Sequence, residues 1–125
     1  SLETLPPIYY TRACLIPSCS IIEQYASHLK EHTNGVIIAT ATSPAGPVVA
    51  LAEKLNWPIF PDILSPLRAF SHPLIISYFD LILKTHPWSF EAVIQIGERL
   101  VSKILLQTLE NPPPKFYLQA FYQLL

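Results

Sequence analysis

Hydrophobic residues along the chain form two kinds of pattern, short unbroken runs and longer segments with helical spacing. Short runs rich in β-branched residues predict strands that are buried on both faces of a parallel sheet. The predicted strands are residues 36–40, 57–62, 92–97 and 115–120. Pro58 and Pro61 weaken the second run, so a short strand or a position toward the sheet edge is expected there.

Apolar residues at helical intervals separate these runs and predict helices between the strands. The predicted helices cover residues 20–33, 47–55, 74–84 and 102–109. The first begins with Ser20 and Glu23 in the spacing of a capping box, and Asn34-Gly35 supplies the left-handed residues that commonly end a helix. Residues 74–84 are apolar nearly all round, which predicts a deeply packed helix.

Alternating strands and helices indicate an α/β fold, a Rossmann-like doubly wound parallel sheet in three layers. The length of 125 residues suits one domain. We expect residues 1–17 to form an extended, proline-containing lead-in and residues 18–125 to form the domain. The start at Ser1, without an initiating Met, suggests a piece of a longer protein.

Composition narrows the classes of function. Charged residues make up only 14% of the chain, against roughly 25% in typical soluble domains, which suggests that another protein surface covers part of this one. The 8 basic residues are scattered and the net charge is −1, so nucleic-acid binding is not expected. The longest apolar stretch, residues 74–83, is about half the length that spans a membrane, so no membrane segment is predicted.

The fold invites a search for the glycine-rich turn that binds dinucleotides, and the sequence does not contain it. Its three glycines are Gly35, Gly46 and Gly97, and the loop after the first strand of the domain reads ATSPAGP (41–47). We therefore predict a Rossmann-like fold without a dinucleotide fingerprint.

Other common chemistries also lack their signatures. Cys14 and Cys19 do not have a redox or zinc spacing and are predicted to be free thiols. His28 and His32 are four residues apart, but no third ligand is apparent nearby and a solvated helix end explains them better. None of the loop serines lies in a nucleophile elbow; these are Ser43, Ser65 and Ser71.

Lys103 is the most informative polar residue. Gly97 closes a buried strand and Ser102 is a plausible N-cap, so Lys103 is predicted at the first position of the next helix, facing the crevice at the carboxyl ends of the strands. A cation there is opposed by the helix dipole, and a nearby anion would resolve the conflict together with exposed backbone N–H groups. The alternative is a side chain that simply extends into solvent.

Several segments, taken together, resemble the middle domain of one enzyme family. They are GVII (35–38), ALAEKLNWPIFPDILSPLR (50–68), VIQIG (93–97) and SKILLQ (102–107). The sequence resembles the MenD family, the 2-succinyl-5-enolpyruvyl-6-hydroxy-3-cyclohexene-1-carboxylate synthases of menaquinone biosynthesis, over about residues 18–120.

The resemblance implies a transferase that uses thiamin diphosphate and Mg²⁺ to decarboxylate 2-oxoglutarate and add the succinyl-semialdehyde unit to isochorismate. Cofactor and metal belong to two flanking domains of the same polypeptide, so the middle domain alone is expected to bind no cofactor and to be inert. The resemblance also implies a homo-oligomer, in the bacterial cytoplasm or, in a plant, in plastids.

Two residues carry the implied substrate contacts. Lys103 matches a family lysine that reaches the active site, although Ile104 stands where many members have arginine. Arg68 matches a recurrent family position, and two interpretations of it stay open: a contact with a neighbouring domain or an anionic ligand, and a surface or structural ion pair. Two other hypotheses remain: the middle domain of an acetolactate-synthase-like enzyme, and a stand-alone ligand-binding or interaction module.

Overall fold

The computed structural model describes residues 8–14, 29, 34–86, 88–110 and 113–122 of the chain. The described strands are β1 (Ile8–Cys14), β2 (Gly35–Ala39), β3 (Ile59–Pro61), β4 (Ala92–Ile96) and β5 (Phe116–Tyr122). The described helical elements are α3 (Ala45–Leu55), the 3-10 helix η2 (Pro66–Ala69), α4 (Phe79–Thr85) and α5 (Lys103–Glu110). The strands predicted at 36–40, 57–62, 92–97 and 115–120 are thus confirmed, and so are the helices predicted at 47–55 and 102–109.

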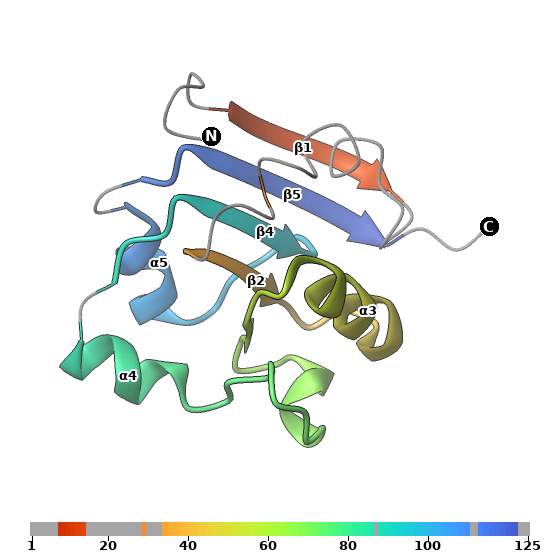
Figure 1. The fold of residues 1–125 in the computed structure, drawn as a ribbon, viewed down its shortest axis with the longest axis horizontal. Coiled ribbons are helices and arrows are strands. Elements are labelled where there is room, and N and C mark those ends of the chain that lie inside the picture. The colour runs from red at the N-terminus through yellow and green to blue at the C-terminus, as the bar shows by residue number, and fades with distance from the viewer. Residues whose placement is uncertain (1–7, 15–28, 30–33, 87, 111–112, 123–125) are drawn as a thin grey trace.

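The strands form one parallel sheet in the order β1-β5-β4-β2-β3 (Figure 1). From β2 the chain passes outward to β3 and then returns across β2 to β4 and β5. The direction of winding therefore reverses between β2 and β4, which confirms the doubly wound α/β fold. β3 has three residues and lies at one edge, as its two prolines predicted.

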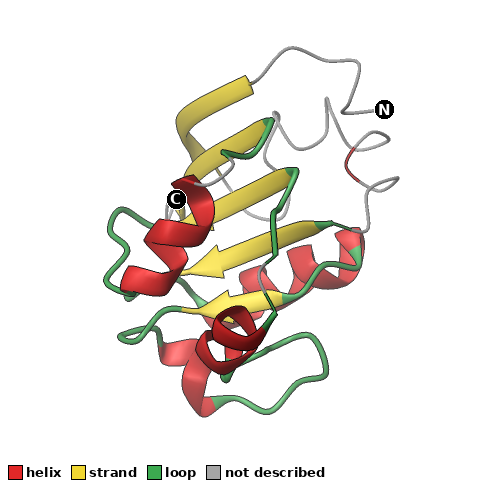
Figure 2. Cartoon of the chain, turned by 90° about the vertical axis from the view of Figure 1, so that its left-hand side faces the viewer, coloured by secondary structure: helices red, strands yellow, loops and turns green. Residues whose placement is uncertain are grey.

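Helices lie on both sides of the sheet, which gives three layers (Figure 2). On one side, Ile37 and Ala39 of β2 pack with the buried face of α3. On the other side, Val36 and Ile38 pack with residues of α4 and α5. Successive strand residues point to opposite faces, so an unbroken apolar strand is needed where both faces are covered. Each fully buried valine or isoleucine stabilises the fold by about 1.5–3 kcal/mol.

The amino-terminal part of the chain contributes a strand that the sequence analysis did not assign. Residues 8–14, within the predicted lead-in 1–17, form β1 and pair with β5 in register from Ile8 and Phe116 to Cys14 and Tyr122. The helix predicted from Ser20 lies outside the described residues except for Leu29. That residue is helical and fully buried in the cluster on the α3 side.

The helix predicted for residues 74–84 is wrong in its first half. Ile75 instead forms a bridge with Ile59, whose N–H donates to the Leu74 carbonyl (2.7 Å) and whose carbonyl accepts from Ile76 N–H (2.9 Å). The exposed edge of β3 needs hydrogen-bond partners, and this requirement overrides helical propensity. α4 starts only at Phe79, and Leu81 is 62% exposed, so deep packing was also wrong. In the described part of the chain, no helix combines the length and apolar character needed to cross a membrane.

The left-handed conformation predicted for Gly35 is wrong, and the end of the predicted helix at residues 30–33 lies outside the described residues. Among described residues, positive φ angles occur at Asn56 and Gly97. Gly35 is instead the first residue of β2, and a Cβ atom there would lie 2.2 Å from the Trp57 indole. Trp57 is fully buried, so this glycine is needed for close packing rather than for backbone conformation.

Candidate functional site

The carboxyl ends of β2 and β4 meet where the winding of the sheet reverses, the usual place for ligands in such folds. The hydroxyl groups of Thr40 and Ser43 both donate to the Ile96 carbonyl, at 2.8 and 2.7 Å. The Ser43 hydroxyl also accepts from the Thr40 N–H (2.8 Å). These bonds clamp the loop after β2 onto the end of β4. Gly97 follows with φ of 104°, and a Cβ atom there would lie 1.8 Å from Thr40 Oγ1.

Lys103 lies where the sequence predicted it, as the first residue of α5 at the carboxyl edge of the sheet. Ser102 acts as the predicted N-cap, because its hydroxyl accepts from the Leu105 N–H (3.4 Å). The Lys103 side chain is exposed and makes no ion pair with any residue that the structure describes. Its ammonium is therefore available to an anion from outside these residues.

Asp62 is a central residue that sequence reasoning missed. It follows β3 directly and is 1% exposed. Its carboxylate accepts from the N–H groups of Val101 (2.6 Å) and Ser102 (3.0 Å). The N–H groups of Val101 and Ser102, which precede α5, are therefore bonded to an internal carboxylate and are not free for a ligand. The predicted contact of a ligand with the N–H groups of the helix start itself stays a prediction. The sequence did contain a sign of this role of Asp62: it is the last residue of a predicted strand, at the edge of the sheet where Lys103 was predicted.

Arg68, a residue of η2, lies close to the end of β3, where Asp62 is located. The Ser65 hydroxyl caps η2 by accepting from the Leu67 N–H (3.2 Å), and the Ser65 N–H donates to the Asp62 carbonyl (2.9 Å). Arg68 Nη1 donates to the Pro61 carbonyl (3.1 Å), while its side chain remains exposed. The fold thus brings the segments that carry both predicted cations to Pro61 and Asp62 at the end of β3.

Arg68 also lines a cavity of about 360 Å³. The walls combine aromatic, hydroxyl and imidazole groups, and include Phe70, Ser71, His72 and Tyr78. A guanidinium with unused N–H donors beside these groups suits a ligand that carries a carboxylate.

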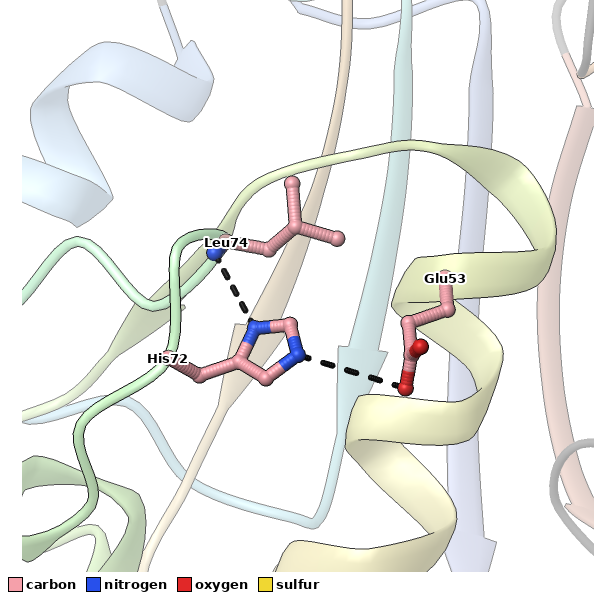
Figure 3. Close-up of polar contacts among 3 residues, drawn as sticks. All are labelled: Glu53, His72 and Leu74. Carbon is pink, nitrogen blue, oxygen red and sulfur yellow. Dashed lines mark hydrogen bonds and ion pairs between the residues drawn. The ribbon is translucent and has the colours of Figure 1, made fainter.

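His72 lines this cavity and makes two polar contacts, which Figure 3 shows. Its Nδ1 accepts from the Leu74 N–H (3.1 Å), and its Nε2 lies 4.0 Å from Glu53 Oε1 on α3. An accepting Nδ1 carries no proton, so the ring proton is on Nε2, toward Glu53. A second cavity of about 310 Å³ lies between α3 and the same loop, and His72 lines both. Sequence reasoning had not singled out His72, since its contacts depend on tertiary packing.

A third cavity, of about 480 Å³, lies beside α5 and is lined by Gln95, Tyr117 and Gln119 among others. The Tyr117 hydroxyl donates to Gln95 Oε1, and both glutamine side chains donate to the Gly97 carbonyl, at 3.1 and 3.3 Å. Burial raises the pKa of Tyr117 from 10.0 to about 12. The hydroxyl therefore stays protonated at neutral pH, and this amide network holds the loop that leads to Lys103.

The remaining candidates from the sequence have structural partners or lie outside the described residues. Ser43 and Ser65 are buried and hydrogen-bonded, and Ser71 is an exposed residue of a cavity wall. Cys19, His28 and His32 lie outside the described part of the chain, and Cys14 is described only in its backbone. Within that part, no three His, Cys, Asp or Glu residues are grouped to hold a metal ion.

The described edge of the sheet does not fit thiamin diphosphate with Mg²⁺. A diphosphate and its metal need free N–H or hydroxyl donors and carboxylate ligands. Here the Thr40 and Ser43 hydroxyls are bonded to Ile96, and the Asp62 carboxylate is bonded to two backbone N–H groups.

Comparison with known proteins identifies several relatives that share one name. The chain is 34% identical to the 2-succinyl-5-enolpyruvyl-6-hydroxy-3-cyclohexene-1-carboxylate synthase of Trichodesmium erythraeum (strain IMS101) over 120 residues, which is 90% of this chain. It is 38% identical over 94 residues, 67% of the chain, to the synthase of the same name from Synechococcus sp. (strain JA-3-3Ab). It is 36% identical over 84 residues, 61% of the chain, to that of Shewanella frigidimarina (strain NCIMB 400). No protein-family model matches the chain.

The chain spans only a small part of these relatives, namely 19%, 16% and 14% of their respective lengths. The similarity therefore corresponds to a single domain of a much longer protein.

Proposed function

We propose that this chain, which belongs to the 2-succinyl-5-enolpyruvyl-6-hydroxy-3-cyclohexene-1-carboxylate synthase family, is the central domain of such a synthase. The family membership rests on similarity over 90% of this chain, which corresponds to 19% of the length of the relative. In this role the chain binds no cofactor and supports the active site from the side. The names of the matched relatives favour this function over an acetolactate-synthase-like enzyme and over a stand-alone binding module.

One observation carries the proposal beyond homology: Lys103 is an exposed cation at the carboxyl edge of a doubly wound sheet. This is the edge where open α/β folds bind ligands. A lysine beside the positive end of a helix is unfavourable in isolation and is favoured by an anionic partner. We assign Lys103, and secondarily Arg68, to carboxylate groups of substrate or intermediate.

The complete enzyme, in this proposal, decarboxylates 2-oxoglutarate and transfers the succinyl-semialdehyde unit to isochorismate. Thiamin diphosphate supplies the carbanion chemistry there and is held with Mg²⁺ by flanking domains of the same polypeptide. This chain contributes positive charge and shape, and is inert alone. We further propose a homo-oligomeric enzyme in the bacterial cytoplasm, with plastids as the setting in a plant.

The test replaces each cation in the complete synthase. Lys103→Ala is expected to lower kcat/KM about tenfold to a hundredfold, because a hydrogen bond to a charged group contributes about 1.5–3 kcal/mol. Arg68→Ala is expected to have a smaller effect, since Nη1 is already bonded within the domain. Lys84→Ala, which removes an exposed cation from the last turn of α4, is the matched control. Unchanged kinetics for both substrates in Lys103→Ala would remove the assignment.

A further inference from the structure

We propose that Asp62 is a positioning residue that sets the place of Lys103, and that it does so through the backbone of residues 101 and 102. This inference rests on the proposed function of Lys103. Asp62 touches neither substrate nor cofactor in this scheme: it acts through the start of α5.

The contacts of Asp62 join several parts of the sheet edge. Its N–H donates to the Ala39 carbonyl at the end of β2 (2.8 Å), and its own carbonyl accepts from Ser65 (2.9 Å), where η2 begins. Its two carboxylate oxygens accept separately from Val101 and Ser102. One residue therefore links the ends of β2 and β3, the helix that carries Arg68 and the helix that begins with Lys103.

The Asp62 carboxylate is well suited to fix the position of the segment that precedes Lys103. Charge-assisted bonds to two consecutive N–H groups restrain both the distance and the rotation of the segment that precedes Lys103. The side chain is almost fully buried, so water cannot easily replace these bonds. Because Asp62 occupies the N–H groups of Val101 and Ser102, these two groups are not offered to an anionic substrate, which the exposed side chain of Lys103 can still reach.

Asp62→Asn is the informative change, because it keeps the size of the side chain and alters its charge and its hydrogen bonding. An amide has one acceptor oxygen, and its NH₂ group would face the second backbone N–H. The start of α5 should shift, and misplacement of a binding group by about 1 Å can lower rates about a hundredfold.

The first experiment needs no variant. Amide hydrogen exchange of the complete synthase should show protection at Val101 and Ser102, although Val101 is 44% exposed and neither residue belongs to a helix or strand. Exchange of both amides at the rate of an unstructured peptide would overturn the proposal, and this holds even if Asp62→Asn fails to fold.

The second experiment is a double-mutant cycle in the complete synthase. If Asp62 acts through Lys103, Asp62→Asn should lower kcat/KM in the native background about tenfold or more and have little further effect once Lys103 is alanine. Asp80→Asn, the same change at an exposed aspartate of α4, is the control and should leave kcat/KM unchanged.

The outcomes separate the two proposals. If Lys103→Ala lowers activity but Asp62→Asn has no effect, or an equal effect in both backgrounds, Asp62 is not a positioning residue for Lys103 and the proposed function stands. If Lys103→Ala itself has no effect, the assignment of Lys103 fails and the role of Asp62 fails with it. A non-additive pair together with protected amides supports both.

Discussion

Gly97 provides the sharpest test of how the sheet edge is built. It connects β4 to the loop that leads to Lys103, and its carbonyl accepts from the side chains of Gln95 and Gln119. Its φ of 104° is one that L-residues rarely adopt, and an added Cβ would overlap Thr40 Oγ1 at 1.8 Å. Gly97→Ala therefore introduces backbone strain and displaces a hydroxyl that bonds the Ile96 carbonyl.

The expected cost follows from these two effects. A residue forced into a sparsely populated backbone region loses about 1–3 kcal/mol. The displaced Thr40 hydroxyl loses a hydrogen bond with a net contribution of about 0.5–1.5 kcal/mol. Together the free energy of unfolding should fall by about 1.5–4.5 kcal/mol, a large share of the about 5–15 kcal/mol typical of a domain.

Equilibrium unfolding in urea, followed by tryptophan fluorescence from buried Trp57 and partly exposed Trp88, measures this change. The matched control is Gly46→Ala in the first turn of α3, where an added Cβ meets no atom within 4 Å. It should stabilise the chain by about 0.4–1 kcal/mol through the unfolded state. Thr40→Ala in the Gly97→Ala background should remove the 1.8 Å overlap, but neither the 2.7 Å approach to Thr42 Oγ1 nor the backbone strain. The reasoning is refuted if Gly97→Ala changes stability by less than about 0.5 kcal/mol, the usual range of a surface substitution.

Two further predictions concern packing and pH. Gly35→Ala should destabilise the chain by about 1–3 kcal/mol because the added Cβ meets the rigid, buried Trp57 ring; an unfolding midpoint equal to that of Gly46→Ala would contradict this packing. Tyr117 stays protonated in the folded chain up to pH about 12 but ionises near 10.0 when unfolded, so its contribution to stability is complete below pH 10 and is lost as pH rises from about 10 to about 12. Tyr117→Phe should lose less stability over that interval than the native chain, with Tyr78→Phe, an exposed tyrosine, as control; parallel pH profiles for Tyr117→Phe and the native chain would argue against a buried phenol.

The sequence by itself determined the elements whose signals are local. The unbroken apolar runs of β2 and β4 predicted buried parallel strands, and the stripe of Val48, Leu51, Ala52 and Leu55 predicted α3. Ser102 predicted the start of α5, and with it the place of Lys103. These signals depend on neighbours within a few residues, so one sequence suffices to read them.

Only the tertiary structure decided which distant groups meet. Asp62 accepts hydrogen bonds from Val101 and Ser102, which lie 39 and 40 positions later in the chain. The hydroxyl groups of Thr40 and Ser43 bond to the Ile96 carbonyl, more than 50 positions later. Residues 74–76 have a helical pattern in the sequence but pair with Ile59 instead, because the edge of β3 needs hydrogen-bond partners. These long-range hydrogen bonds form because buried polar groups must be paired across the whole fold. The pattern of residues within one short segment does not indicate which distant group will be the partner.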